Sequence, residues 1–421
     1  MQHSRKQAYW NWLLLSAFFA YQYLLRIYPS IFTDEIRATF QFSAHEFSTL
    51  STYCIGVYSC LQIPFGILLD RMGVRWITIA SLSLCLIGQY LFTHTHVQWV
   101  AQWGRILIGI GSAPAFIGAV KVISDSFPNR LYGIFMGMTC VLGMIITMVS
   151  SHWLRQLDAA GLSWQQAIDG LSWVGCILLV ILLLSLTTVN EDRPADASGK
   201  YACFWSSFWS VLLNHKVFLY ALLTIGTCAV VNTVSDLWGP AFLSAKYHLS
   251  PLQAVHYNQS IFAGLMVGSF LLPTVFNEGK KILQGIRMCY LVLVGIFMGL
   301  IYGSASIPPF LLQTALFVAG IVACADILCF SLTAQLSTPK TSACIVGWVN
   351  TINMLGLSCL QGLVAFSLDK HWSGVTNTQG LRIYQARDYE FALGVLLNVV
   401  IGGTVIAWCM RNKNYNLKNE Y

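Results

Sequence analysis

One helical stripe near the N-terminus combines aromatic, amide and guanidinium groups. It consists of Phe19, Gln22, Tyr23 and Arg26, at positions i, i+3, i+4 and i+7, which share one face of an α-helix. Arginine can hold a carboxylate through two parallel hydrogen bonds, and an apolar environment strengthens that contact. The stripe therefore predicts a binding point for a carboxylate-bearing small molecule. The alternative is that Arg26 lies at the level of the lipid headgroups.

Three further polar pairs stand three or four residues apart, so that the members of each pair share a helix face. They are Tyr58 with Gln62, Asn232 with Asp236, and Asn350 with Asn353. We expect these pairs to contribute to a polar, substrate-binding lining. Asp236 precedes Trp238-Gly239-Pro240 and is expected nearer to the outer surface.

Asp326 is the most isolated acid of the sequence, within A-C-A-D-I-L at 323–328. A carboxylic acid inside a helix bundle can take up and release a proton, so Asp326 is our candidate for a proton carrier. A structural ion pair or a water-filled vestibule would explain it equally well. Arg105 also stands inside an apolar stretch, which costs about 2.5–3.5 kcal/mol on insertion scales. Arg105 should therefore face the bundle interior, unless it extends to the outer interface.

The sequence lacks the motifs that would indicate ATP hydrolysis, metal binding or enzymatic catalysis. The sequence contains no G-x-x-x-x-G-K-[ST] loop, so ATP is not the expected energy source. The 13 cysteines are scattered singly through apolar blocks, and no His/Cys cluster has metal-ligand spacing. We find no nucleophile paired with a base. We therefore expect no catalytic residues, no metal, no cofactor and no enzymatic activity.

The composition identifies the environment in which these residues work. Of 421 residues, 56% are hydrophobic and 10% are charged, against roughly 25% charged in soluble domains. The mean hydropathy is +0.63, and the apolar blocks have about the 20 residues that a membrane-spanning helix needs. Porin-type strands would alternate polar with apolar residues, which these blocks do not. The net charge of +7 is not placed as a nucleic-acid site would require.

The blocks predict an all-α membrane protein with twelve transmembrane helices in two six-helix halves (residues 1–189 and 217–421), joined by a cytoplasmic linker (190–216). An aromatic segment at 204–209 should make part of that linker an amphipathic piece on the membrane surface. The first block lacks a cleavage site and reads as a retained helix. The predicted spans are 8–32, 46–69, 75–93, 97–121, 131–154, 165–188, 217–243, 252–276, 283–304, 307–335, 342–368 and 389–410.

An even number of spans returns the chain to the side on which it began. With both termini in the cytoplasm, sixteen of the 24 basic residues lie inside, six lie outside, and Arg26 and Arg105 fall within spans. This excess agrees with the positive-inside rule and supports the orientation. The six outside residues are Arg37, Arg155, Lys246, Lys370, Arg382 and Arg387.

The loop after the second span reads G-I-L-L-D-R-M-G-V-R over residues 66–75 and resembles the G-x-L-x-D-R-x-G-x-R loop of the major facilitator superfamily. Here Gly66 would allow close helix packing and Gly73 a tight turn. Asp70 could face the N-terminus of the eleventh span, and that attraction would hold one conformer shut. An ordinary solvated turn is the alternative. The expected gating residues are Gly66, Asp70, Arg71, Gly73 and Arg75.

Two further spans support the resemblance. The run R-I-L-I-G-I-G-S-A at 105–113 is similar to the superfamily's R-x-x-x-G-x-G-x-A stretch, which implies a part in proton coupling or substrate contact for Arg105. The fifth span lacks the Gly-Pro pair of the superfamily's drug antiporters, which disfavours efflux. Small-xxx-small pairs predict that the fifth and eighth spans pack together across the interface between the halves. These pairs are Gly133 with Gly137 and Gly264 with Gly268.

Within the superfamily, the runs at 23–30, 62–66 and 104–116 look like the phagosomal metabolite transporters of intracellular gammaproteobacteria. This resemblance implies a secondary active transporter that imports an amino acid or nucleoside across the bacterial inner membrane by alternating access, with a proton or other coupling ion. A siderophore transporter of the same fold is the alternative, and a non-transporting receptor or polytopic membrane enzyme a remote one. The expected partners are the substrate, the ion and the lipid bilayer, and we expect a monomer.

Overall fold

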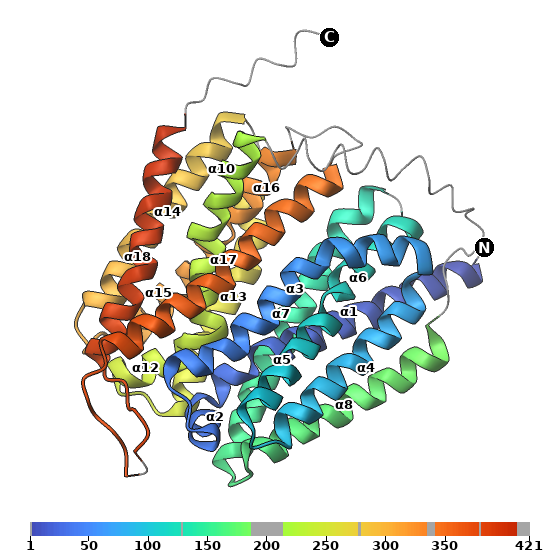
Figure 1. The fold of residues 1–421 in the computed structure, drawn as a ribbon. Coiled ribbons are helices and arrows are strands. Elements are labelled where there is room, and N and C mark those ends of the chain that lie inside the picture. Colours follow the sequence, from blue (N-terminus) through green and yellow to red (C-terminus); the bar gives the residue numbers. More distant parts are fainter. Residues whose placement is uncertain are drawn as a thin grey trace. The chain divides into compact units, whose positions relative to one another are not determined.

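The computed structural model describes residues 2–127, 129–186, 214–276, 279–334, 342–378 and 380–410, almost all of them in helices (Figure 1). The predicted linker lies outside the described residues except for 214–216, and so does its aromatic segment at 204–209. The chain divides into two compact units. Unit 1 is Met1–Asp196 with Thr378–Leu381, and unit 2 is Ala197–Asn377 with Arg382–Tyr421.

Unit 1 contains the first six predicted spans. The third span is α4, and the fourth span consists of α5 and α6. A short helix, α2, follows the first span. The helices are α1 (Gln2–Ile31), α2 (Thr33–Phe40), α3 (Ala44–Met72), α4 (Val74–Thr93), α5 (Gln98–Ser112), α6 (Pro114–Ser126), α7 (Asn129–Ala159) and α8 (Trp164–Ser185).

Unit 2 contains the other six spans, of which the seventh and tenth are divided into shorter pieces. The seventh alternates α-helix with two π-helical segments, η1 and η2. The elements are α10 (His215–Thr224), η1 (Ile225–Ala229), α11 (Val230–Thr233), η2 (Val234–Trp238), α12 (Gly239–Tyr247), α13 (Pro251–Val275), α14 (Gly279–Tyr302), α15 (Pro309–Ala323), α16 (Ala325–Ala334), α17 (Ser342–Lys370) and α18 (Ala386–Cys409).

The described helices thus confirm the twelve predicted spans. Ten helical stretches are long and apolar enough to cross a membrane by themselves. The first and second spans, α1 and α3, are not among the ten and contain the polar stripe and the Tyr58–Gln62 pair. Three of the described spans begin with a serine capping box, which satisfies N–H groups that a helix start leaves free. The cap residues are Ser43 before α3, Ser163 before α8 and Ser250 before α13.

The fourth and tenth spans are each interrupted, where the sequence predicted continuous helices. Between α5 and α6, Ala113 donates to the Ile110 carbonyl, three residues back, and Pro114 has no N–H to donate. Between α15 and α16, Cys324 likewise donates to the Ile321 carbonyl. Each interruption replaces the usual four-residue step of the hydrogen bonds with a three-residue step. The two units therefore share a break in the corresponding helix.

Glycines bring α13 and α15 into close contact within unit 2. A Cβ at Gly268 would lie 2.6 Å from the Ile321 carbonyl oxygen, and one at Gly264 would overlap the Phe317 carbonyl. Within unit 2 the close partner of this pair is therefore the tenth span, and the predicted packing against the fifth span stays a prediction. The role of the other pair, Gly133 and Gly137 on α7, stays a prediction.

The loop between α3 and α4 has the turn that its sequence predicts. Gly73 has φ +77°, a conformation that favours glycine, and it both ends α3 and precedes α4. No described residue lies within 4 Å of the Cβ position at Gly66, so the close packing expected there is not seen. The side chains of Asp70 and Arg71 lie outside the described part of the chain, and their gating role stays a prediction.

In each unit, an arginine on the third span hydrogen-bonds to the end of the last helix. In unit 1, Arg75 at the start of α4 donates to the Leu183 carbonyl near the end of α8, at 3.0 Å. In unit 2, Arg287 on α14 donates to the Ala407 carbonyl at 2.9 Å and the Met410 carbonyl at 2.7 Å, at the end of α18. Figure 1 shows α14 alongside α18. A cation at a helix C-terminus also offsets the partial negative charge there.

The helix α2 is anchored to unit 1 by a buried charge. Arg155 on α7 forms a 2.6 Å ion pair with Glu35 of α2 and donates to the Ile31 carbonyl at 3.2 Å. Its second ion pair is with Asp158, at 3.2 Å. Burial raises the pKa of the Glu35 carboxyl, and the Arg155 cation opposes this rise without cancelling it.

Candidate functional site

The predicted stripe on α1 meets the predicted pair on α3 inside unit 1. The Arg26 guanidinium lies over the Tyr23 ring, 4.1 Å from its centroid, and Arg26 is 8% exposed. On α3, Gln62 lies one turn after Tyr58 and close to it, and Tyr58 also lies within electrostatic reach of Arg26. Gln22 is buried beside them on α1. Arg26 is therefore enclosed by protein, which disfavours a position among lipid headgroups.

Phe19, the first residue of the stripe, has its ring centroid 6.2 Å from that of Tyr23 and also packs against α6 and α7. Its ring lies against Gly143 of α7, where a Cβ would be 2.9 Å from the ring edge, and its centroid is 5.3 Å from that of Phe116. Phe19 thus helps to hold α1 against α6 and α7. The polar group of unit 1 consists of Gln22, Tyr23, Arg26, Tyr58 and Gln62.

Arg105 is completely buried on α5, and its bonds explain how a membrane span tolerates it. It donates to the carbonyls of Leu25 at 2.7 Å, Arg26 at 3.2 Å and Leu50 at 3.2 Å. In a helix the Leu25 carbonyl would accept from residue 29, but Pro29 has no N–H. Arg105 therefore supplies the donor that Pro29 removes, and it links α5 to α1 and α3.

No carboxylate among the described residues forms an ion pair with Arg105. Its other neighbours are aromatic rings: the guanidinium lies 5.4 Å from the Tyr28 centroid and 6.0 Å from that of Phe92. Carbonyl oxygens and ring faces both stabilise a buried guanidinium. This arrangement disfavours the outer interface for Arg105. Its part in proton coupling stays a prediction, and its visible contribution is to fix the backbone next to Arg26.

A second polar group lies in unit 2, around the thiol of Cys228. Asn232 donates to the Cys228 sulfur at 3.4 Å, and Asp326 and Asn353 lie beside this thiol. The Asp326 carboxylate accepts from the Ile327 N–H at 2.7 Å, at the start of α16. The structure therefore brings together three residues that we predicted separately, from the seventh, tenth and eleventh spans.

Cys228 was missed by the sequence reasoning, which treated every cysteine as a small membrane-core residue. It lies in η1, and a π-helical turn inserts an extra residue into the helix and re-aims nearby side chains. The available signal was its position four residues before Asn232. Asn350 is half-buried on α17, and its place in a substrate lining stays a prediction.

Asp236 belongs to a different group and lies deeper than predicted. It is 1% exposed within η2, eleven residues before α12 ends at Tyr247, rather than near the outer surface. Ser235 donates to its carboxylate at 3.1 Å, and Asn258 of α13 donates to the Ser235 carbonyl at 2.9 Å. In the π-helical pattern that carbonyl would accept from residue 240, but Pro240 has no N–H. Asn258 supplies the missing donor.

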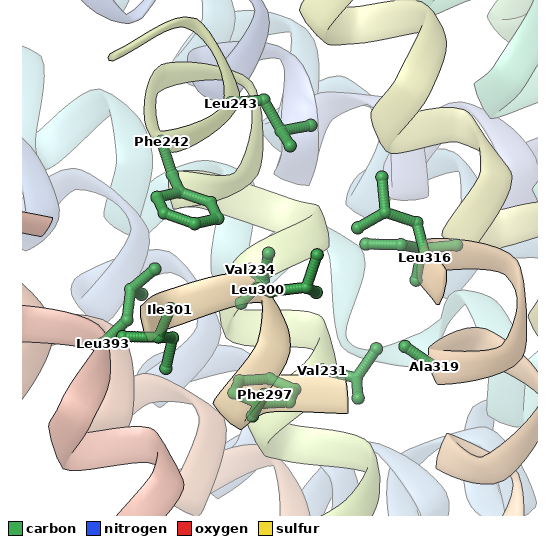
Figure 2. A pocket seen from close by; sticks show the side chains of 11 residues that line it. Val231, Val234, Phe242, Leu243, Phe297, Leu300, Ile301, Leu316, Ala319 and Leu393 are labelled. Atoms are coloured by element: carbon green, nitrogen blue, oxygen red, sulfur yellow. The ribbon is translucent and has the colours of Figure 1, made fainter. Parts of the chain in front are cut away.

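A small cavity of about 20 Å³ lies inside unit 2, and Figure 2 shows the apolar side chains that surround it. Phe297, Leu300 and Ile301 come from α14, and Phe242 and Leu243 from α12. Such a volume holds about one water molecule, and a water needs polar partners that this lining does not supply. The cavity is therefore a packing defect and does not serve as a substrate site.

Comparisons with known proteins agree with this architecture. Over 418 residues, the chain is 22% identical to an uncharacterised transporter, YybO, of Bacillus subtilis, covering 93% of each chain. It is 23% identical to a probable L-galactonate transporter of Escherichia coli over 303 residues, which is 68% of this chain and 66% of the relative.

Solved structures show the same fold at low sequence identity. A bacterial homologue of the human lysosomal transporter Spinster, inward-facing and unoccupied, matches with a TM-score of 0.76 and 14% identity over 96% of both chains. The nucleoside transporter NupG matches with a TM-score of 0.74 and 12% identity, over 94% of this chain and 99% of that one. The model of the Major Facilitator Superfamily matches residues 13–359. The chain is therefore a multi-pass membrane protein that belongs to the major facilitator superfamily of transporters.

Proposed function

We propose that this transporter imports an amino acid or nucleoside across a bacterial inner membrane by alternating access, with both termini in the cytoplasm and uptake coupled to protons. The observation that carries the proposal is the enclosed Arg26 guanidinium beside the Tyr58–Gln62 pair. An ionisable side chain inside a membrane span is a candidate functional residue. A substrate carboxylate would bind Arg26 in two-point geometry, and the tyrosine and amide groups would select polar substituents.

The coupling proton would bind Asp326. This acid lies beside Cys228 and accepts a hydrogen bond from the Ile327 N–H, and no described cation forms an ion pair with it. Protonation would remove a charge from the bundle, and an inward proton gradient could thereby drive uptake. The loop at 66–75, with Asp70 and Arg71, would hold one conformer shut, as the resemblance implies.

Uptake by proteoliposomes that contain the purified chain tests this function. Labelled amino acids, nucleosides and a ferric siderophore are offered separately, with and without an inward proton gradient. We expect concentrative uptake of a carboxylate-bearing amino acid or of a nucleoside. Exclusive transport of the siderophore would favour the alternative, and absence of uptake and counterflow for the whole panel would refute the proposal.

Variants separate binding from folding. Arg26→Ala should reduce uptake of carboxylate-bearing substrates at least tenfold, because it removes a charge-assisted pair, and should leave uncharged analogues less affected. Equal loss for both classes would indicate a folding defect. Tyr58→Phe should weaken uptake, whereas Tyr53→Phe is the matched control, since Tyr53 is 40% exposed on the same helix.

Asp326→Asn tests the coupling. We expect this variant to lose gradient-driven accumulation and to retain exchange of substrate across the membrane, because the amide cannot carry a proton. Undiminished accumulation by Asp326→Asn would refute the assignment of the proton to this residue.

A further inference from the structure

The Cys228 thiol joins three polar side chains from three different spans of unit 2. Asn232 is one turn away on α11, Asp326 begins α16, and Asn353 belongs to α17. Asn232 donates to this sulfur at 3.4 Å, and Asp326 and Asn353 lie beside it. The side chains are therefore gathered around one point, although they are far apart in the sequence.

This cluster presents oxygen acceptors without matching donors. The Oδ1 atoms of Asn232 and Asn353 are buried and accept no hydrogen bond from the described residues, and the two side chains are 6% and 1% exposed. Asp326 adds a carboxylate that forms no ion pair with a described lysine, arginine or histidine. Buried acceptors that lack donors are unfavourable, and Asp326, which is half-buried, adds a negative charge beside them. The cluster is therefore chemically incomplete.

We propose that Asn232, Asp326 and Asn353 form a binding site for a small monovalent cation, either a sodium ion or a primary ammonium group. Carboxylate and amide oxygens are the ligands that hard cations prefer, and an ammonium group donates three hydrogen bonds to the same atoms. A proton alone would neutralise Asp326 and leave both amide oxygens without a donor. One cation could satisfy all three acceptors, with Cys228 holding the side chains in place.

The local backbone supports a binding role. Cys228 lies in one of two π-helical segments of the seventh span, and such segments occur frequently at functional sites. Among the described residues, the thiols of Cys228 and Cys329 lie within electrostatic reach of Asp326, and the thiol of Cys324 lies near Cys228. None of these thiols supplies a positive charge.

The test is the thermal unfolding midpoint of the purified full-length chain in detergent at pH 8. Sodium chloride and methylammonium chloride are compared with choline chloride at equal ionic strength, since choline has no N–H group and is too large. A saturating ligand that binds only the folded state should raise the midpoint by a few degrees. Asn353→Leu and Asn232→Leu should each abolish the rise, and Cys329→Ala, the matched thiol control, should keep it.

The pattern of responses identifies the cation. A rise with sodium alone would indicate a coupling ion, and a rise with methylammonium alone would indicate the amine of a substrate. No rise with either salt, or a rise that survives Asn353→Leu, would overturn the proposal. Binding of radioactive sodium to Asp326→Asn and to the unmodified chain gives a second measurement that does not depend on the unfolding transition.

This inference rests on the proposed function only for the role that the bound cation would have in transport. The binding itself is measured without transport. Cation-dependent stabilisation in a chain that transports no metabolite would support the site and refute the proposed function. Uptake without any cation response would support the function and refute the site.

Discussion

The pairing of Pro29 with Arg105 can be measured as a coupling free energy. Arg105→Met removes the three donated hydrogen bonds while keeping a long side chain. The Arg26 and Leu50 carbonyls can still accept from helical N–H groups, whereas the Leu25 carbonyl loses its donor because residue 29 is proline. One buried carbonyl without a donor costs about 1–3 kcal/mol. This cost is the part of the loss in the free energy of unfolding that should arise only when residue 29 is proline.

Pro29→Ala should cancel that part of the loss. Alanine restores the N–H that the Leu25 carbonyl needs, so Arg105→Met should be milder by about 1–3 kcal/mol in the Pro29→Ala background. The free energy of unfolding of the two single variants, the double variant and the unmodified chain, measured by detergent titration, gives the coupling. Pro64→Ala on α3 is the matched control, because it removes an in-helix proline with which Arg105 forms no hydrogen bond.

A coupling below about 0.5 kcal/mol would refute the reasoning, since uncoupled sites add to within that amount. A similar coupling with Pro64→Ala would also refute it, because the effect would then report general helix flexibility. Arg105→Lys keeps the charge but cannot reach three carbonyls with a planar fork, so it should recover only part of the stability. Full recovery by lysine would mean that charge, and not the pattern of donors, stabilises this region.

Three other predictions concern packing, pH and a buried ion pair. Gly264→Ala should destabilise unit 2 by about 1–3 kcal/mol, because the added Cβ overlaps the Phe317 carbonyl. Gly295→Ala should be neutral or stabilising, because nothing lies within 4 Å of the added Cβ. Equal melting temperatures of the two variants would contradict the close packing of α13 on α15. The raised pKa of Glu35 means that the folded chain binds its proton more tightly than the unfolded chain does, so this group adds stability as the pH falls through its folded pKa toward 4.5. Glu35→Gln should flatten that part of the curve of melting temperature against pH, and an unchanged curve would show that Glu35 is not the group responsible. The Lys246 side chain is 3% exposed and forms an ion pair with Glu390 at 2.8 Å. Lys246→Met should therefore lower the free energy of unfolding by about 1–3 kcal/mol. Lys370→Met is the control and should leave it unchanged, because Lys370 is exposed.

Ten of the described spans were predictable from their long apolar stretches, whereas α1 and α3 contain more polar residues and do not meet that criterion. The gathering of Arg26, Tyr58 and Gln62 was also expected, since helix periodicity places them on defined faces. Two kinds of feature were not predictable from these rules. The π-helical segments add a residue to a turn, so periodicity assigned Asn232 and Asp236 to one face, whereas the structure puts them in separate groups. The donor role of Arg105 depends on which carbonyl a distant proline leaves free, and that requires the packing of α5 on α1.

The glycine pair on α13 shows a related limit. The spacing of Gly264 and Gly268 correctly indicated a close contact, because small residues allow backbones to approach. The spacing does not specify the partner, and the partner is α15 in the same unit. Likewise, the sequence identified Asp326 as exceptional and did not indicate that Cys228 would lie beside it, because a single cysteine in an apolar block usually packs as a small hydrophobic residue.

The arginines at 75 and 287 have a consequence for movement. Each one links the last helix of a unit to the third span of that same unit. The donor and the acceptor would therefore move together if a unit tilted as one body. Neither bond would need to break during such a tilt, and the C-terminal ends of α8 and α18 would stay attached to α4 and α14. Bending within a unit would then concentrate at Ala113 and Cys324, where the regular ladder of helical hydrogen bonds is already interrupted.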